Sequence, residues 1–348
     1  MVGRQNGAPV QPGARRHRLP GRHRLPGRHC PLWEQHCCLP LSVDAPLVEE
    51  LSRFARPGGT YLSLNVGYAP HRTEQVLELL RSFRKQVDFD ERLMLAATIA
   101  DVDAAAASGR TAVAFDLEDS NPLDGDLANV QRFYNLGVRT MLPTYNHRNA
   151  AGSGSLDAVD EGLTAYGRAL VAEMNAVGMV VDGSHCGART AMQLCEVSTA
   201  PMIYSHSCLR SVWEHPCNIT DEQARACAAS GGVIGINGVG IFLGANTATL
   251  DAMVRHIDHA VSLVGVRHVG LGSDYSFDFA DFNDELTNNP GLFDESYTRW
   301  GPINSVPPEK LHGIGDALRS RGYSADDVAA IMSGNFLRVA QQVWKSAA

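Results

Sequence analysis

The 348-residue sequence predicts an α/β protein of the (β/α)8 TIM-type barrel class, of the metal-dependent hydrolase type. Short apolar runs rich in β-branched residues alternate with amphipathic stretches from about residue 60 onward. Continuously apolar strands that alternate with helices indicate a parallel sheet covered by helices on both faces. About eight such units fit in roughly 310 residues, which suits a barrel of this class. A doubly wound open sheet is the alternative.

Eight segments carry the strand pattern of this barrel. In chain order they are 61–66, 93–98, 112–117, 138–143, 179–181, 202–204, 233–236 and 269–271. The earlier segment 30–35 has a poor strand pattern. If the first barrel strand nevertheless lies there, nine candidates compete for eight places, and we assign 93–98 to a peripheral position.

The helical stretches show apolar residues at helical spacing. In the stretch 74–87, Val76, Leu80 and Phe83 fall on one helical face. The stretch 250–264 repeats this pattern. Ser324 and the two aspartates that follow predict a capped helix start ahead of another apolar face.

The N-terminal segment differs in composition from the rest of the chain. The first 30 residues contain seven Arg and no acidic residue, and the hexapeptide RHRLPG occurs twice, at 16–21 and 22–27. A segment rich in Gly, Pro and Arg cannot bury a core, so we expect residues 1–28 to be disordered and 29–348 to form one barrel domain. The rest of the chain is acidic, which argues against a nucleic-acid partner.

The sequence also bears on the compartment. No run approaches the roughly 18 apolar residues that a membrane helix needs, and the N-terminus lacks the apolar core of a signal peptide. The eight cysteines form no CxxC pair, so reduced thiols are expected. We therefore expect a cytoplasmic protein without a membrane partner.

Four polar side chains stand at strand ends. Glu118, His185, His206 and Asp274 each come within four residues after an apolar strand candidate. The carboxyl ends of barrel strands meet on one face, where barrel enzymes carry out their chemistry. Two imidazoles and two carboxylates are ligands typical of zinc-type divalent metals. Other histidines, His71 among them, do not follow a strand and are expected to be structural or on the surface.

At these residues the sequence resembles a known family. The segments FDLEDSNPLDGDL, GMVVDGSHCGART, PMIYSHS, HPCNITDEQ, GGVIGINGVGIFLG, HVGLGSDY and GNFLRVA are similar to motifs of the membrane (renal) dipeptidase family. This is metallopeptidase family M19, within the amidohydrolase-like barrels. The resemblance extends from about residue 36 to residue 345 in the right order. It implies hydrolysis of the peptide bond of a dipeptide at a binuclear zinc site.

The resemblance also implies roles for the strand-end residues. Glu118 would bridge the two metals, and His185 and His206 would bind the more buried one. Asp274 would be the acid/base partner that orients the attacking water and protonates the leaving amine. This division of labour suits the chemistry, because metals polarise a carbonyl while a carboxylate transfers the proton.

The chain departs from the family pattern at the first strand. That strand normally ends in His-x-Asp-Leu-Pro, whose two charged residues bind the second metal. The nearest match begins at His36 and has Cys38 in place of the Asp. Because a thiolate can bind zinc, we expect His36 and Cys38 as ligands of the second metal, with one or two Zn²⁺ per chain.

Two further departures concern the substrate. The family has an Arg eleven residues after the second zinc His, which holds the substrate carboxylate, and here that position is Cys217. A thiol cannot replace a charged, bidentate guanidinium, so binding of a free C-terminal carboxylate should be weaker. Nothing in the sequence shows whether the nearby Arg210 points inward. Tyr145 stands where well-known members carry a His that contacts the tetrahedral intermediate, and its hydroxyl could donate to an oxyanion.

Three functions remain open at this point. The first is a zinc dipeptidase with a modified carboxylate pocket, acting on a small peptide. The second is a metal-dependent amidohydrolase acting on a non-dipeptide amide or a lactone. The third is a metal-poor barrel with a binding or structural role. The resemblance suggests a homodimer, and the long segment 275–311 is a candidate lid over the pocket.

Overall fold

Parallel strands form the centre of the computed structural model, which describes residues 31–345. The segment 1–28, expected to be disordered, lies outside the described residues. Seven strands lie side by side in the order β6-β5-β4-β2-β1-β8-β7. Along the chain these strands are β1 (Leu32–Cys38), β2 (Thr60–Asn65), β4 (Thr111–Leu117), β5 (Val138–Met141), β6 (Val180–Val181), β7 (Ile234–Ile236) and β8 (Val269–Leu271).

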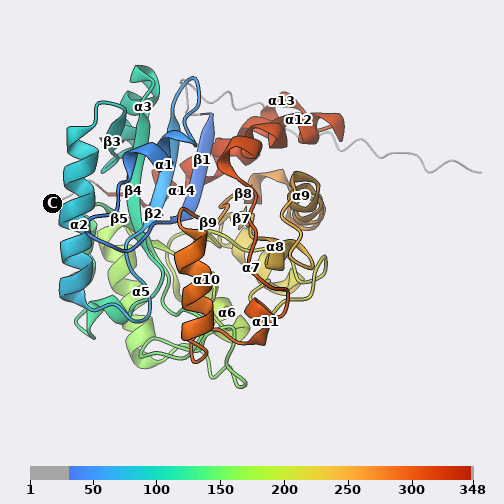
Figure 1. Ribbon diagram of the computed structural model, residues 1–348. Helices are drawn as coiled ribbons and strands as arrows, with labels where there is room; N and C mark the ends of the chain where they lie inside the picture. The colour runs from blue at the N-terminus through green and yellow to red at the C-terminus, as the bar shows by residue number, and fades with distance from the viewer. Residues whose placement is uncertain (1–30, 346–348) are drawn as a thin grey trace, which may run out of the picture.

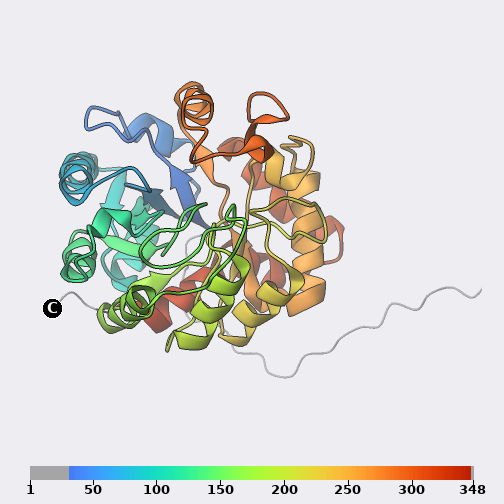
Figure 2. The same ribbon diagram turned by 90° about the horizontal axis from the view of Figure 1, so that it is seen from below.

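The segment 202–204 fills the eighth place in the ring. Parallel bridges join Asp182 to Ile203 and Tyr204 to Ile234, and so connect the β6 side to β7. The strands therefore close into a ring, with helices arranged around it (Figures 1 and 2). This confirms the predicted (β/α)8 barrel and rules out the open doubly wound sheet.

The peripheral position predicted for 93–98 is confirmed. Strand β3 (Leu93–Leu95) pairs with β4 outside the ring. The segment 30–35 has a poor strand pattern in the sequence, but most of it forms part of β1, a buried strand of seven residues. Its unusual residues are buried with specific partners: Trp33 stacks on Tyr61 at a ring distance of 3.7 Å, and Gln35 donates to Thr140 across the barrel. A strand with satisfied polar groups can be buried without an apolar pattern.

A β-bulge in β1 aims its last residues into the barrel. Between the pairs Glu34–Leu62 and Cys37–Leu64, β1 advances three residues while β2 advances two. As a result, consecutive side chains reach inward, since Gln35 bonds to Thr140 and His36 bonds to Asp116. Bulges beside active sites commonly re-aim a side chain in this way.

The helices lie outside the strands and confirm the predicted amphipathic stretches. The longer ones are α2 (Thr73–Phe89), α3 (Ile99–Ser108), α4 (Ala128–Asn135), α5 (Ala165–Val177), α6 (Ala188–Val197), α7 (Asp221–Ala229), α9 (Leu250–Val264), α12 (His312–Ser320) and α14 (Asn335–Val343). The short ones are α1 (Val48–Ser52), α8 (Gly240–Leu243) and α13 (Ala325–Ala329). Ser324 caps α13, as predicted. No helix within residues 31–345 is long and apolar enough to cross a bilayer.

Helix α14 packs at the end of the barrel where the strands begin. Its Phe336 belongs to one buried cluster with Trp33 and Tyr61, which lie near the starts of β1 and β2. A Cβ atom on Gly270 would lie 2.4 Å from the Phe336 ring, so only glycine fits at that position. With this end filled, the opposite end is left for the site.

The segment 275–311, a candidate lid, follows β8 and supplies part of the wall of the large cavity described below. It contains β9 (Tyr275–Ser276), which pairs with β1, followed by α10 (Phe279–Asn288) and α11 (Glu295–Thr298). In Figure 1 these elements lie in front of the barrel.

Candidate active site

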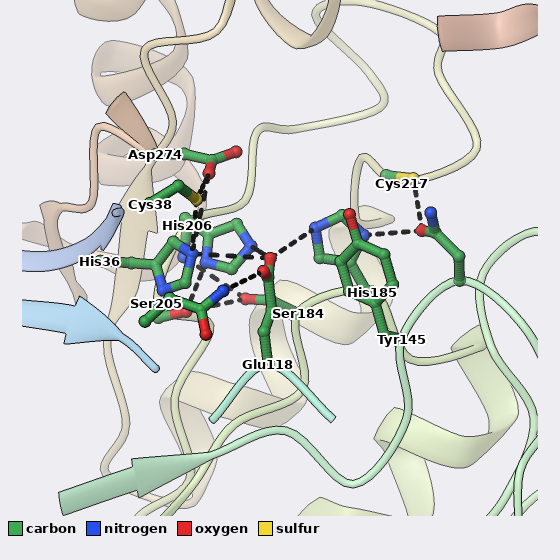
Figure 3. A network of polar contacts seen from close by, with 12 residues as sticks. His36, Cys38, Glu118, Tyr145, Ser184, His185, Ser205, His206, Cys217 and Asp274 are labelled. Carbon is green, nitrogen blue, oxygen red and sulfur yellow. Dashed lines mark hydrogen bonds and ion pairs between the residues drawn. The ribbon is translucent and has the colours of Figure 1, made fainter. Parts of the chain in front are cut away.

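Three histidines converge on one carboxylate oxygen at the carboxyl ends of the strands (Figure 3). The Oε1 atom of Glu118 lies 3.5 Å from Nε2 of His36, 3.7 Å from Nε2 of His185 and 3.4 Å from Nε2 of His206. One ligand atom from each of four side chains lies within 4.8 Å of the others: His36, Glu118, His206 and Asp274. Imidazole nitrogens around carboxylate oxygens are a donor set that suits zinc-type cations.

The far nitrogen of each imidazole is held by a second residue. The Nδ1–H of His36 donates to Asp116 at 3.0 Å, and the Nδ1–H of His185 donates to the Asn146 amide oxygen at 2.8 Å. For His206, the Nδ1 atom lies 2.7 Å from the Ser205 hydroxyl. Oxygens that only accept place a proton on Nδ1 of His36 and of His185, and the neutral His185 then turns its Nε2 lone pair toward Glu118. The Ser205 hydroxyl can donate or accept, so it does not select the tautomer of His206.

The charge states of His185 and Glu118 fit metal binding, whereas His36 and Cys38 would each have to lose a proton. Burial alone would lower the pKa of His36, but Asp116, Cys38 and Glu118 outweigh it and raise that pKa, and burial raises the pKa of the Cys38 thiol. Burial, reinforced by the nearby His206, lowers the pKa of His185 to about 3, so this imidazole is neutral near pH 7. Burial alone would raise the pKa of Glu118, but the facing His36 and His206 outweigh it and lower that pKa, which keeps the carboxylate ionised. Metals bind neutral imidazoles and ionised carboxylates, so neither group must lose a proton first.

Cys38 and Asp274 lie on the His36 side of the cluster. The Cys38 thiol donates to Oδ1 of Asp274 at 3.2 Å, and its sulfur is 3.5 Å from Nε2 of His36. The other oxygen of Asp274 accepts from the Asn237 amide at 2.9 Å. Both predicted residues therefore lie beside the histidine cluster, and each contacts a neighbour that limits its orientation.

Backbone strain is concentrated at this site. Asn146, His185 and Asp274 have φ values of 56°, 56° and 54°, in the left-handed region. Residues other than glycine pay about 1–3 kcal/mol for such a conformation, and they persist where the surroundings enforce it. Each of these residues follows the end of a barrel strand, so the strained turns present the side chains to the centre.

Tyr145 packs on the His185 ring. The two ring centroids are 4.5 Å apart, and the Tyr145 amide donates to Asp119 at 2.9 Å, which fixes the backbone. The Tyr145 hydroxyl has no hydrogen-bond partner within residues 31–345, and the residue lines the large cavity. Its hydroxyl is therefore available to a bound molecule.

A cavity of about 620 Å³ opens above the cluster. This volume is typical of pockets for small molecules. The predicted site residues on its wall are Cys38, Glu118, Tyr145, His185 and Asp274. His71, expected to be structural or on the surface, also lines this cavity. No signal in the sequence marks His71, because it belongs to a loop and not to a strand end.

Cys217 lies behind His185 and does not line the large cavity. Its sulfur is 3.2 Å from the Tyr297 hydroxyl, 3.3 Å from the Ser155 hydroxyl and 3.7 Å from the Asn146 amide oxygen. It lines a second cavity of about 350 Å³ instead, and Figure 3 shows it on the far side of His185 from Glu118. The thiol therefore faces the second cavity, which His185 also lines, and its role at a substrate carboxylate stays a prediction.

Arg210 does not supply a positive charge to the large cavity. Its guanidinium donates to the backbone oxygens of Pro216 and Asn218, and the residue lines the second cavity. The residues that sequence reasoning missed are the amides and carboxylates that hold the site: Asn65, Asp116, Asn146 and Asn237. Among them only Asp116, two residues before Glu118, had a signal in a strand-end motif.

Comparisons with known proteins agree with this geometry. The family model of the membrane dipeptidases (peptidase family M19) matches residues 52–299, a span that begins after His36 and Cys38. An uncharacterized protein in the pqqA 5' region of Klebsiella pneumoniae is 32% identical over 73% of this chain and 90% of its own length. The dipeptidase verJ of Clonostachys rogersoniana is 34% identical over 57% of this chain and 54% of its own length.

A solved structure supports the same assignment. An amidohydrolase from Pseudomonas aeruginosa superposes with a TM-score of 0.81 at 25% identity, covering 90% of this chain and 96% of that one. The chain spans about half the length of several curated dipeptidases that it matches. Together with the metal-ligand cluster, these findings support metal-dependent hydrolysis of a peptide substrate. The chain belongs to the membrane dipeptidase family, peptidase family M19.

Proposed function

We propose that the chain is a zinc-dependent dipeptidase with a binuclear site. Glu118 would contribute to the binding of both ions, His185 and His206 would hold one, and His36 and Cys38 would hold the other. The observation that carries the proposal is the convergence of three Nε2 atoms on one Glu118 oxygen. Zinc is the metal we propose because nitrogen, oxygen and a thiolate sulfur together suit it better than Mg²⁺ or Ca²⁺.

The residues fit such a group. Nε2 of His206 is buried and makes no hydrogen bond, although it lies 3.4 Å from the Glu118 oxygen. An unsatisfied buried nitrogen beside a carboxylate is costly unless a cation occupies the space between them. When bound, the ions would polarise the substrate carbonyl and lower the pKa of the attacking water.

Asp274 and Tyr145 carry the proton and charge chemistry of the proposed reaction. The Cys38 thiol donates to one oxygen of Asp274 only while it is protonated, so this contact would be lost when the thiolate binds a metal. The Asn237 amide donates to the other oxygen, which keeps the carboxylate beside the histidine cluster. From there Asp274 takes a proton from the attacking water and returns it to the leaving amine. The unpartnered hydroxyl of Tyr145 donates to the oxygen that becomes negative.

A second candidate is hydrolysis of an amide or lactone that is not a free dipeptide. It is favoured by the lining of the large cavity, which includes neither Lys nor Arg among the described residues. A free C-terminal carboxylate thus lacks a positively charged partner there.

The test compares a dipeptide with its C-terminal amide on the zinc-loaded protein, with the zinc content measured in parallel. We expect one to two zinc ions per chain and hydrolysis of the free dipeptide. Hydrolysis of the amide alone would favour the second candidate. Fewer than one zinc per chain and no hydrolysis would favour a metal-poor barrel.

A further inference from the structure

The wall of the large cavity carries more negative charge than the proposed chemistry uses. Besides Glu118 and Asp274, four more acids line it, and none of its described lining residues is Lys or Arg. The four acids come from α10 and the residue before it: Asp278, Asp281, Asp284 and Glu285. Burial lowers the pKa of the two histidines on the wall, His71 and His185, so neither supplies a positive charge near pH 7.

Three of these acids form one stripe along α10. Asp281, Asp284 and Glu285 are spaced three and four residues apart, so they share a helix face, and all three line the cavity. None of them forms an ion pair within residues 31–345, and burial raises the pKa of Glu285. Like charges at this spacing repel one another and destabilise a helix. A positive charge inside the cavity would relieve that repulsion.

The aromatic lining is an independent observation that points to the same kind of ligand. The cavity's aromatic residues are Tyr68, Tyr145, Phe242, Phe282, Phe293 and Tyr297. Tyr68 and Tyr145 are more than nine-tenths buried, yet within the described part of the chain neither hydroxyl has a hydrogen-bond partner. Aromatic faces attract organic cations, and phenol hydroxyls can orient the polar part of the same molecule.

We infer that the cavity selects substrates that carry an organic cation, an ammonium or guanidinium group, held by Asp281, Asp284 and Glu285 beside the aromatic wall. This rests on the proposed function for the hydrolysed bond and adds the substrate class: a dipeptide-like amide with a basic side chain. Because no Lys or Arg among the described residues lines the cavity away from the proposed metal site, the α10 acids would repel a substrate whose side chain is anionic.

The experiment measures kcat/KM of the zinc-loaded protein for Lys-Ala and Ala-Lys, each against its Nε-acetyl-lysine counterpart. Acetylation removes the charge and keeps the aliphatic stem of the side chain. We expect a preference of at least about tenfold for free lysine in one of the two positions, the scale of a hydrogen bond to a charged group. The preference should shrink at high NaCl, because salt screens partly exposed charges. If the preference for free lysine over Nε-acetyl-lysine is smaller than about tenfold at both residues of the dipeptide, the inference is overturned.

Two variants locate the effect. Asp281→Asn/Asp284→Asn/Glu285→Gln should bring the lysine preference close to one. The matched control Glu78→Gln/Asp88→Asn/Asp103→Asn removes three exposed acids on α2 and α3, outside the cavity lining, and should leave the preference unchanged. Equal loss of the preference in both variants would assign it to net charge and overturn the inference.

A binding measurement separates this inference from the proposed function. Calorimetry with Nα-acetyl-lysine methylamide and its Nε-acetyl counterpart needs no turnover. If no dipeptide is hydrolysed but the free lysine compound binds at least about tenfold tighter, the proposed function fails and the inference stands. If neutral dipeptides are hydrolysed and the two probes bind equally, the proposed function stands and the inference fails.

Discussion

Replacing Asn146 by Ala should weaken metal binding although Asn146 is not a proposed ligand. Its amide oxygen accepts the Nδ1–H of His185 at 2.8 Å and the Tyr297 hydroxyl at 3.1 Å. Without it, the His185 ring loses the contact that fixes its tautomer and aims Nε2 at Glu118, 3.7 Å away. Such outer partners of a metal-binding histidine are worth a factor of about 10–100 in metal affinity, or about 1.4–2.7 kcal/mol.

The assay is competition for zinc between the protein and a chromophoric chelator. The backbone must be controlled for, because Asn146 has a φ of 56° and alanine tolerates that conformation poorly. Asn246 is a matched control: its φ is 55°, its amide donates to the Pro302 oxygen and accepts from the Asn304 amide, and it lines neither of the two cavities described above. Asn146→Gly additionally removes the Cβ strain.

We expect Asn246→Ala to lower the melting temperature and leave zinc affinity unchanged, while Asn146→Ala and Asn146→Gly both lose zinc affinity. Wild-type affinity in Asn146→Ala would refute the reasoning. So would equal losses in Asn146→Ala and Asn246→Ala, because the effect would then be global.

The remaining predictions concern the proposed metal ligands, the acid/base residue Asp274, Cys217 and two buried histidines. His185→Ala or His206→Ala should abolish tight zinc binding and activity, while the circular dichroism spectrum stays that of the wild type. Full zinc content in both variants would contradict the ligand assignment. Asp274→Asn should keep the metal but lower kcat at least about 100-fold, and wild-type turnover would remove Asp274 from the mechanism. Cys217→Arg should weaken zinc binding by disturbing Asn146 and His185, whereas a KM that falls for dipeptides but not for their amides would place this side chain at the substrate carboxylate after all. Burial lowers the pKa of His215 and of His256 from 6.5 to about 4, so each is protonated more readily in the unfolded chain. Each histidine should therefore lower the free energy of unfolding of metal-free protein by up to about 1.4 kcal/mol per pH unit as the pH drops from about 6.5 to 4. Glu34 and Asp119, whose pKa burial raises to about 7, act in the opposite direction, so the measurement is the difference between urea titrations of the wild type and of a His256→Asn variant. A difference that does not change with pH would contradict this.

The barrel was predictable because its signals are local. Strands that are buried on both faces leave continuous apolar runs, and polar residues at their carboxyl ends fall on one rim by topology alone. That rule suffices to bring Glu118 and His206 together, and their side chains do lie in contact range. The peripheral place of 93–98 depended on the resemblance, because the family's first-strand motif at His36 added a ninth strand candidate for eight positions.

The first strand and the supporting residues depend on contacts that no local pattern encodes. The polar residues of β1 are buried because partners such as Thr140 and Ser273 reach them from distant strands. The same holds for Asn146, whose role depends on a hydrogen bond across 39 residues of sequence. At Cys217 the family position alone did not indicate the surroundings of the side chain, because its neighbours Tyr297, Ser155 and Asn146 come from distant parts of the chain.

The most direct test of the central claim is the anomalous scattering map of zinc-loaded crystals at the zinc edge. A binuclear site should give one peak beside His185 and His206 and another beside His36 and Cys38, on the two sides of the Glu118 carboxylate. A map without a peak at His185 and His206 would contradict it.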